Sequence, residues 1–255
     1  MISQGRYIYA IVELWKKNSN ERPKSYGNIG IGDSHPEVYL IENGKIGAFV
    51  SDSPVVTYQL SRENMLTHER IIEKIMNDYT ILPMQFSTVS ENDAMIHALI
   101  EKEREVFSTE LEKLLGKREM GLKAIFHEKI YDDIASTDNA VIKLKAEAQR
   151  YGASQALLIE VGKAVESALI NEKNRCKEDI LATLSPLAIE TVEGKLIGER
   201  MLLNAAFLID DLKESDFDDA VNLVGNRYSE RMKFKYVGNA PAYNFVRLTI
   251  KLNSN

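Results

Sequence analysis

The pattern of apolar and polar positions in the first half of the chain predicts strands around one tight turn. Residues 6–14 are rich in aromatic and β-branched side chains, which is typical of a buried strand. Residues 37–41 and 45–51 flank Asn43-Gly44, and because Asn-Gly readily adopts positive φ angles, we expect an antiparallel hairpin there. The glycines of 27–33 match neither a Walker loop nor a dinucleotide-binding fingerprint, so we expect a bulge or tight turn.

The stretch 65–89 has the most internal structure and predicts a helix, a turn and a strand. Ser61 is the expected N-cap. One helix face is apolar at helical spacing: Ile71, Ile72, Ile75, Met76 and Tyr79. Pro83 removes the preceding residue from helical geometry, and Met84 to Val89 then alternates as a strand would.

A second long helix is expected before Gly116. Ser90 and Asp93 form a candidate capping pair at its start. Its inner stripe would consist of Met95, Leu99, Val106, Leu111 and Leu114. The first domain should end with this helix.

From residue 121 the predicted order becomes strand, helix, strand, strand, helix, strand. The expected strands are 121–128, 187–192, 201–209 and 232–237, and the helices are 138–184, interrupted near 151–152, and 216–228. This is the plan of ferredoxin-like (βαββαβ) domains. Residues 243–252 would add a strand at the sheet edge. The sequence therefore predicts an α+β protein of two domains, a mixed α+β domain over 1–117 and a ferredoxin-like domain over 118–255 with an extra C-terminal strand.

The helix expected over 154–184 is longer than one small sheet can cover, at about 46 Å. Its apolar face carries Leu158, Val161, Val165, Leu169, Cys176, Ile180 and Leu184. Part of it should pack on the first domain, or else protrude toward a partner, and we favour the former. We expect Cys176 to be packed rather than reactive.

Composition and charge narrow the classes of partner. The formal net charge of −6 gives no basic surface for nucleic acid or for an anionic membrane. A single cysteine permits no internal disulfide, which fits a reducing cytoplasm. The apolar runs 7–12 and 201–209 fall short of the roughly 20 residues that a spanning helix needs. Protein partners are the expectation, with no cofactor, no nucleic acid and no membrane.

Candidate chemistry is sparse. His68-Glu69 begins a zinc-type H-E-x-x-H motif, but Ile72 replaces the second histidine, so we interpret both residues as flank positions that hydrogen-bond a neighbouring loop or strand. The acidic residues between 210 and 219 fit a helix start, with Ser215 and Asp218 as capping pair. The remaining histidines are scattered, and no serine or cysteine lies in a nucleophile elbow. We assign no catalytic, metal or cofactor residue.

Recognition of RNA by a ferredoxin-like domain would need exposed aromatic residues on its central strands. Phe126 and Phe207 occupy these strands without the accompanying basic and glycine pattern. The alternation of lysines and aromatic residues in 232–236 is ordinary sheet patterning. An RNA-binding role is therefore not expected.

Two blocks of the sequence resemble the gas vesicle proteins of the F/L family. The first runs from His68-Glu69-Arg70 into 81–89, the second spans 234–246, and residues 7–12 also fit. The positions that carry the likeness are His68, Glu69, Arg70, Pro83, Phe86, Phe234, Tyr236, Gly238, Pro241, Tyr243 and Phe245. The F type is favoured over the L type.

The resemblance implies a minor accessory component of gas vesicles, the hollow protein shells that hold gas in some microbes. Such proteins are thought to act early in assembly, in the cytoplasm and at the vesicle, by binding the hydrophobic shell protein A and preventing its aggregation. Other accessory proteins would be further partners. The family has no established catalytic residues, so the resemblance implies no enzyme.

One hypothesis places the shell-protein contact at the expected C-terminal strand or at the adjoining turn 238–241. An unpaired strand edge can add a strand from a partner, and the edge residues would be Tyr243, Phe245, Arg247 and Thr249. The alternative to the assembly role is an α+β enzyme or a small-ligand regulatory module with a pocket between the domains.

Overall fold

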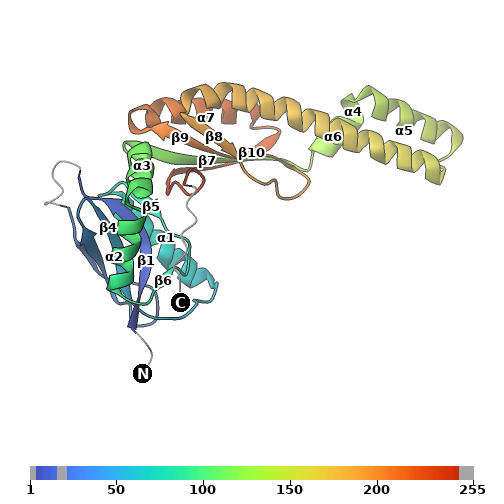
Figure 1. Ribbon diagram of the computed structural model, residues 1–255. Coiled ribbons are helices and arrows are strands. Elements are labelled where there is room, and N and C mark those ends of the chain that lie inside the picture. The colour runs from blue at the N-terminus through green and yellow to red at the C-terminus, as the bar shows by residue number, and fades with distance from the viewer. Residues whose placement is uncertain (1–3, 16–21, 247–255) are drawn as a thin grey trace. The chain divides into compact units, whose positions relative to one another are not determined.

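The computed structural model describes residues 4–15 and 22–246, which form two compact units (Figure 1). Unit 1 comprises Met1–Arg118 and Asn239–Asn255, and unit 2 comprises Glu119–Gly238. The internal boundary lies within two residues of the expected one. The C-terminal end differs from the expectation, because the chain returns to unit 1 after Gly238 instead of extending the second domain to residue 255.

Unit 1 is built on a six-stranded sheet in the order β2-β3-β4-β1-β5, with β6 also paired to β1. These strands are β1 (Gln4–Glu13), β2 (Ser25–Asn28), β3 (Glu37–Asn43), β4 (Ile46–Pro54), β5 (Ile81–Pro83) and β6 (Val89–Ser90). The expected hairpin is confirmed: β3 and β4 are antiparallel, Asn43 lies opposite Ile46, and Gly44 has a φ of 67°.

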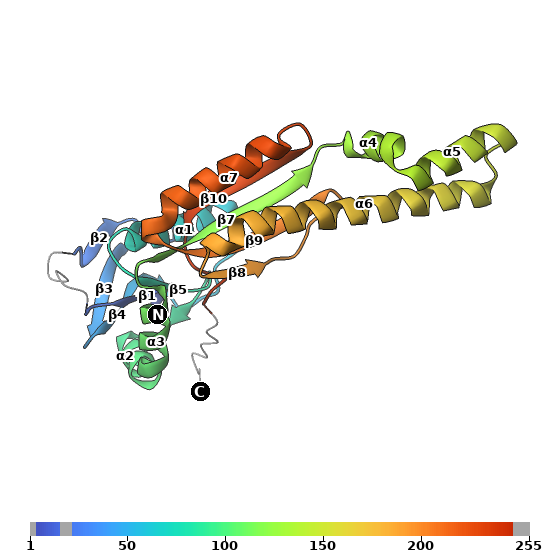
Figure 2. The ribbon, with the colours of Figure 1, turned by 90° about the horizontal axis from the view of Figure 1, so that it is seen from above.

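Strand β1 is the centre of unit 1, because it pairs with β4 on one side and with β5 and β6 on the other. Helix α1 (Arg62–Met76) packs against β1, while α2 (Asp93–Lys102) and α3 (Arg104–Leu114) lie on the other side of the sheet (Figure 2). The expected cap of α1 is confirmed, since the Asn64 N–H donates to Ser61 Oγ at 3.1 Å. Both faces of β1 are therefore buried, including Tyr7 and Tyr9.

The segment after β5 differs from the expected strand at Met84 to Val89. The backbone N–H of Met84 donates to the Tyr9 carbonyl, but residues 86–87 then turn, and Ser87 has a φ of 67°. The Ser87 N–H donates to the hydroxyl of Tyr7 at 2.8 Å. Because a side chain rather than a neighbouring strand satisfies this N–H, the alternating pattern does not become a strand.

The helix expected before Gly116 starts at another cap and is divided into two helices. Its N-cap is Asn92, whose Oδ1 accepts the Met95 N–H at 3.0 Å, and not Ser90. The helix breaks at Glu103, which separates α2 from α3. Leu99, Leu111 and Leu114 of the expected stripe are buried, whereas Ile96 and Phe107 are buried in place of Met95 and Val106.

Unit 2 contains a four-stranded sheet in the order β10-β7-β9-β8. Its strands are β7 (Lys117–Phe126), β8 (Glu190–Glu193), β9 (Met201–Asp210) and β10 (Met232–Ala240). Helices α6 (Gln155–Leu184) and α7 (Glu214–Tyr228) bury their apolar faces in the same core as β7 and β9. Each β-α-β connection thus skips over one strand, which is the split pattern of the ferredoxin-like plan.

Two short 3₁₀ turns in unit 2 correct the expected starts of a strand and a helix. A 3₁₀ turn at Ser185–Leu187 delays β8 to Glu190, later than expected. A second 3₁₀ turn, Asp211–Lys213, is capped by Asp210, so α7 has already begun before the expected Ser215 cap. Asp218 instead accepts the hydroxyl hydrogen bond of Tyr236.

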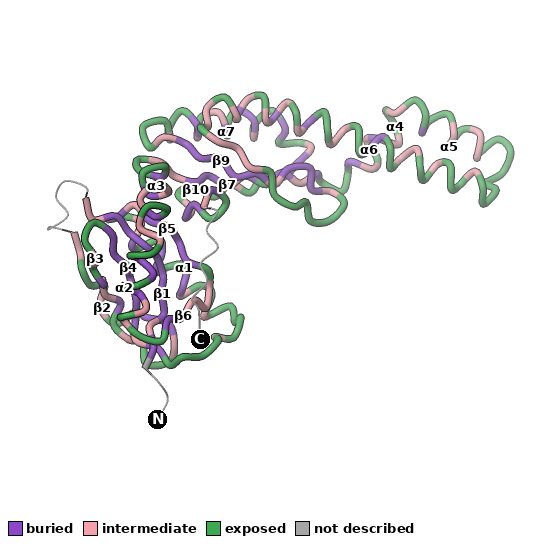
Figure 3. The backbone as a smooth tube through the Cα atoms, viewed as in Figure 1, coloured by how far each residue is buried: buried purple, intermediate pink, exposed green. Residues whose placement is uncertain are grey.

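Within unit 2, helices α4 (Ile130–Thr137) and α5 (Asn139–Tyr151) form an arm with the N-terminal part of α6. At the expected interruption, Gly152 has a φ of 86° and the chain reverses direction between α5 and α6. Helix α4 was not expected from the sequence. Exposed and half-exposed residues predominate along this arm, whereas the buried part of α6 lies over the sheet (Figure 3). Accordingly Leu169, Cys176, Ile180 and Leu184 are buried, while Leu158 is exposed.

The expected strand at 243–252 does not begin where predicted. Strand β10 ends at Ala240, and Tyr243 to Phe245 form a turn in which the Phe245 N–H donates to the Ala242 carbonyl at 3.1 Å. This correction covers Tyr243 and Phe245 of the proposed edge. Arg247 and Thr249 lie outside the described residues.

Candidate functional site

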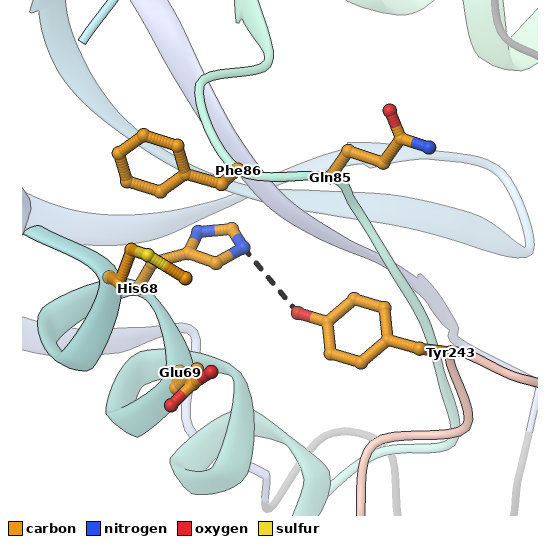
Figure 4. A pocket seen from close by; sticks show the side chains of 6 residues that line it. His68, Glu69, Gln85, Phe86 and Tyr243 are labelled. Atoms are coloured by element: carbon orange, nitrogen blue, oxygen red, sulfur yellow. Dashed lines mark hydrogen bonds between the residues drawn. The ribbon is translucent and has the colours of Figure 1, made fainter. Parts of the chain in front are cut away.

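Unit 1 contains a pocket of about 230 Å³ that joins the two blocks of the family resemblance (Figure 4). Its lining consists of Met65, His68, Glu69, Gln85, Phe86 and Tyr243. His68, Glu69 and Phe86 belong to the first block and Tyr243 to the second. The fold therefore brings together His68 and Tyr243, which are 175 positions apart in the sequence.

Helix α1 supplies one wall of the pocket. Met65, His68 and Glu69 are spaced by three and four residues, so they lie on one side of the helix. His68 is buried at the inner end, whereas Met65 and Glu69 are exposed at the outer end. The turn after β5 supplies Gln85 and Phe86, and the C-terminal turn supplies Tyr243. The wall thus runs from the core of unit 1 to solvent.

Hydrogen bonds to both ring nitrogens fix the orientation of His68. Nε2 lies 3.1 Å from the Met84 carbonyl oxygen, and Nδ1 lies 3.1 Å from the Tyr7 hydroxyl. Since a carbonyl oxygen only accepts, Nε2 carries the proton and Nδ1 accepts from Tyr7. The Tyr7 hydroxyl in turn accepts from the Ser87 N–H. The expectation that His68 hydrogen-bonds a neighbouring loop is confirmed.

The Tyr243 hydroxyl completes the surroundings of His68 from the pocket side, 3.5 Å from Nε2. The Phe86 ring stands edge-on to the imidazole, with ring centroids 5.8 Å apart. Tyr7 and Tyr9 pack behind it, with centroids 5.6 and 5.9 Å from the imidazole. The floor of the pocket is therefore an aromatic cluster with hydroxyl groups at defined positions.

Burial controls protonation in this cluster. It lowers the pKa of His68 to about 4, against the smaller opposing effect of the Met84 carbonyl. Burial also raises the pKa of Tyr9 to about 12 and that of Tyr7 further. The pKa of Tyr243 is raised by burial, and the nearby Glu69 and Glu73 add to the shift. At neutral pH the imidazole and the phenols are therefore uncharged, and Glu69 supplies the acidic group of the lining.

The geometry gives His68 no free nitrogen for a metal or a substrate, because Tyr7 and Met84 engage both positions. Over residues 4–15 and 22–246, no three His, Cys, Asp or Glu side chains come close enough to hold a metal ion. Cys176 is buried in unit 2, where desolvation and the adjacent Glu172 raise the pKa of its thiol. This cysteine is packed, as expected.

The other positions of the resemblance lie elsewhere. Pro83 pairs with Ala10 in the sheet of unit 1, and Pro241 and Phe245 are buried after β10. Arg70 is exposed on α1. Phe234 and Tyr236 pack on the core of unit 2, and Gly238 faces Met120 there. The pocket therefore gathers four of these positions; except for the exposed Arg70, the others belong to strands or pack in the two units.

Sequence reasoning missed three residues of the site. The apolar pattern places Tyr7 only on a buried strand, although the Tyr-x-Tyr spacing also puts Tyr7 and Tyr9 on one face of it. Helical spacing gives Met65 no role beyond its place in the helix. Gln85 gave no signal, because its place in the pocket depends on the turn that replaced the expected strand.

No helix in the part of the chain that the structure describes has the length and apolar character to cross a membrane. Exposed large apolar side chains of unit 1 lie in a loop and at the start of α1, within residues 55–66, and also at Val106, Leu115 and Tyr243. Two of these, Met65 and Tyr243, also line the pocket.

Comparison with known proteins gives one consistent family. The chain matches the model for the gas vesicle synthesis protein GvpL/GvpF over residues 5–247. It is 28% identical to gas vesicle protein F of Nostoc sp. over 203 residues, or 78% of this chain and 83% of that protein. With gas vesicle protein F of Streptomyces sp. it shares 24% identity over 242 residues, covering 94% of this chain and 98% of that protein.

Solved structures agree with the sequence comparisons. The crystal structure of gas vesicle protein GvpF from Anabaena sp. matches with a TM-score of 0.82 at 25% identity, covering 97% of this chain and 100% of that chain. The GvpF structure from Microcystis aeruginosa, at 20% identity, shares the fold with a TM-score of 0.76 over 96% of this chain and 99% of that chain. The α+β fold is therefore common to all three.

Proposed function

The chain belongs to the gas vesicle synthesis family GvpL/GvpF, and on that premise we propose that it binds the hydrophobic shell protein A and keeps it from aggregating early in vesicle assembly. In this role it acts as an accessory protein in the cytoplasm and at the gas vesicle, together with other accessory proteins. It is not an enzyme and uses no cofactor.

The observation that supports this role is the exposure of apolar side chains in the pocket of unit 1 and at the start of α1. Met65 and Tyr243 line the pocket and are exposed, and Leu60 and Leu66, close to Met65 in the sequence, are also exposed, with Leu60 at 78%. Exposed apolar groups that gather at one place mark interaction sites more often than single ones do. A shell subunit with an apolar face would cover such a surface.

This location replaces the added-strand hypothesis for the same contact. Tyr243 and Phe245 form a turn, so they offer no strand edge. Phe245 is buried and cannot be reached by a partner, whereas Tyr243 is 40% exposed beside Met65. We therefore place the contact at the pocket and at the start of α1.

The enzyme alternative finds less support in this pocket. An active site is expected to have convergent polar groups with a nucleophile, an acid or a base. Here the lining is mostly apolar, and its one histidine is bonded on both nitrogens. The pocket therefore favours an assembly role.

The test measures binding and aggregation of shell protein A with matched surface variants. Leu60→Asp should reduce co-purification of the shell protein and its protection from aggregation, followed by light scattering. Leu212→Asp is the control, because Leu212 is 92% exposed but lies in unit 2. Normal vesicles in a deletion strain, or no binding by the unmodified chain, would reject the proposed role.

A further inference from the structure

The pocket of unit 1 combines an apolar lining with an acidic rim. Met65, Phe86 and Tyr243 supply apolar surface, and Glu69 stands at the mouth on the exposed side of α1 (Figure 4). Neither lysine nor arginine is among the six lining residues. The pocket therefore has the charge complementary to a cation.

Neighbouring groups strengthen this negative character. Glu73 follows Glu69 by one helical turn, and its charge, like that of Glu69, raises the pKa of Tyr243. Within the described residues Glu69 forms no ion pair. The carboxylate of Glu69 is thus available to a cation from outside.

The size of the pocket suits one side chain. Its volume of about 230 Å³ falls below the roughly 300–1,000 Å³ of pockets that hold drug-sized ligands. Lysine and arginine carry an apolar stem and a charged head, so a single side chain can use both parts of the lining. Aromatic rings such as Phe86 and Tyr243 also attract cations through their faces.

We propose that this pocket receives one lysine or arginine side chain of the shell protein, with the stem against Met65, Phe86 and Tyr243 and the charged head at Glu69. The inference rests on the proposed function and adds the site and the chemistry of recognition. The exposed apolar residues of 55–66 then contact the apolar surface that flanks the basic residue. His68 holds the pocket floor in place without touching the cation's charge.

Binding of shell protein A to the full chain tests this assignment through charge reversal. Glu69→Lys should weaken binding about tenfold or more, because it places two cations together. Glu69→Gln should weaken binding less and reduce its dependence on salt. Glu112→Lys, at an exposed position of α3, is the matched control, and this variant should bind shell protein A as the unmodified chain does. Glu69 is exposed, so thermal melts should show all three variants folded.

A small probe tests the pocket without the shell protein. Titration with n-butylguanidinium should shift the ring NMR signals of His68 and Tyr243 in the unmodified chain at millimolar concentration. The same titration should leave these signals unchanged in Glu69→Lys, and butyrate should not shift them in the unmodified chain. Absence of a shift in the unmodified chain would overturn the inference.

The outcomes separate the two proposals. If the unmodified chain does not bind shell protein A, the proposed function fails and the inference fails with it. If shell protein A binds the unmodified chain and Glu69→Lys equally well, the inference alone is wrong and the binding role stands.

Discussion

The hydroxyl of Tyr7 lies 3.1 Å from Nδ1 of His68 and links the central strand of unit 1 to helix α1. The same hydroxyl accepts the Ser87 N–H at 2.8 Å, and the opposite nitrogen of His68 reaches the Met84 carbonyl at 3.1 Å. One strand, one helix and one turn are thereby joined under the pocket. These buried hydrogen bonds fix the turn that carries Gln85 and Phe86.

Replacing Tyr7 with phenylalanine should destabilise unit 1. The variant keeps the ring packing but leaves the Ser87 N–H and His68 Nδ1 without their partner, at a cost of about 1–3 kcal/mol. Urea unfolding followed by the fluorescence of Trp15, the single tryptophan, reports on unit 1. Tyr39→Phe is the control, since its hydroxyl meets the half-exposed Asp52 and should cost less. Equal losses in the two variants would contradict the role given to Tyr7.

Stability should fall as the pH drops from about 6.5 to about 4. The folded state keeps His68 neutral down to a pKa of about 4, whereas the unfolded chain binds a proton below the ordinary value of 6.5. The unfolded state therefore binds more protons between these values, and up to about 3 kcal/mol is lost on acidification. The unfolding free energy of His68→Gln should depend less on pH in this window. His97→Gln, at an exposed position, should behave as the unmodified chain.

The C-terminal turn should contribute to the stability of unit 1. Phe245 is 1% exposed, and its carbonyl oxygen lies 3.4 Å from the Nζ of Lys113 on α3. Removal of a buried phenylalanine side chain costs about 3–5 kcal/mol, so Phe245→Ala should lower the urea midpoint of the Trp15 signal strongly. Tyr243→Ala removes a half-exposed ring and should lower the midpoint less. A Phe245→Ala midpoint equal to that of the unmodified chain would show that the turn does not hold unit 1 together.

Two glycine substitutions should act in opposite directions. A Cβ at Gly30 would lie 2.5 Å from the Pro36 carbonyl oxygen and 3.0 Å from Ser51 Cβ, so Gly30→Ala should cost about 1–3 kcal/mol. A Cβ at Gly162, an interior position of α6, would meet no atom within 4 Å. Gly162→Ala should therefore stabilise the helix by about 0.5–1 kcal/mol. Trp15 fluorescence measures the first change and the far-ultraviolet circular dichroism of the helices the second.

Local signals in the sequence predicted the elements whose geometry depends on adjacent residues. Asn43-Gly44 predicted the β3–β4 hairpin because few other dipeptides adopt its φ angles. Ser61 predicted the start of α1 because its side chain reaches a backbone N–H three residues ahead. The order of strands and helices likewise indicated the ferredoxin-like plan of unit 2.

Predictions failed where a distant partner satisfied the backbone. The pattern of 84–89 alternates as in a strand, but the Tyr7 hydroxyl holds Ser87 in a turn. The single helix expected before Gly116 did not include the break at Glu103, because no residue there is a helix breaker. The interruption expected near Gly152 is a reversal that pairs α5 with α6, and the short-range pattern indicated the break but not this pairing.

The family, the fold class and the lack of a complete metal or nucleophile motif could be read from the residues, because these depend on residue types at short spacing. The contact of His68 and Glu69 with Tyr243 in one pocket emerges only in the folded chain. That contact joins positions 175 residues apart, and it arises because the chain returns to unit 1 after Gly238. The apolar pattern that begins at Tyr243 favoured a strand. Instead, Phe245 is buried in unit 1, and residues 243–245 form a turn that brings Tyr243 to α1.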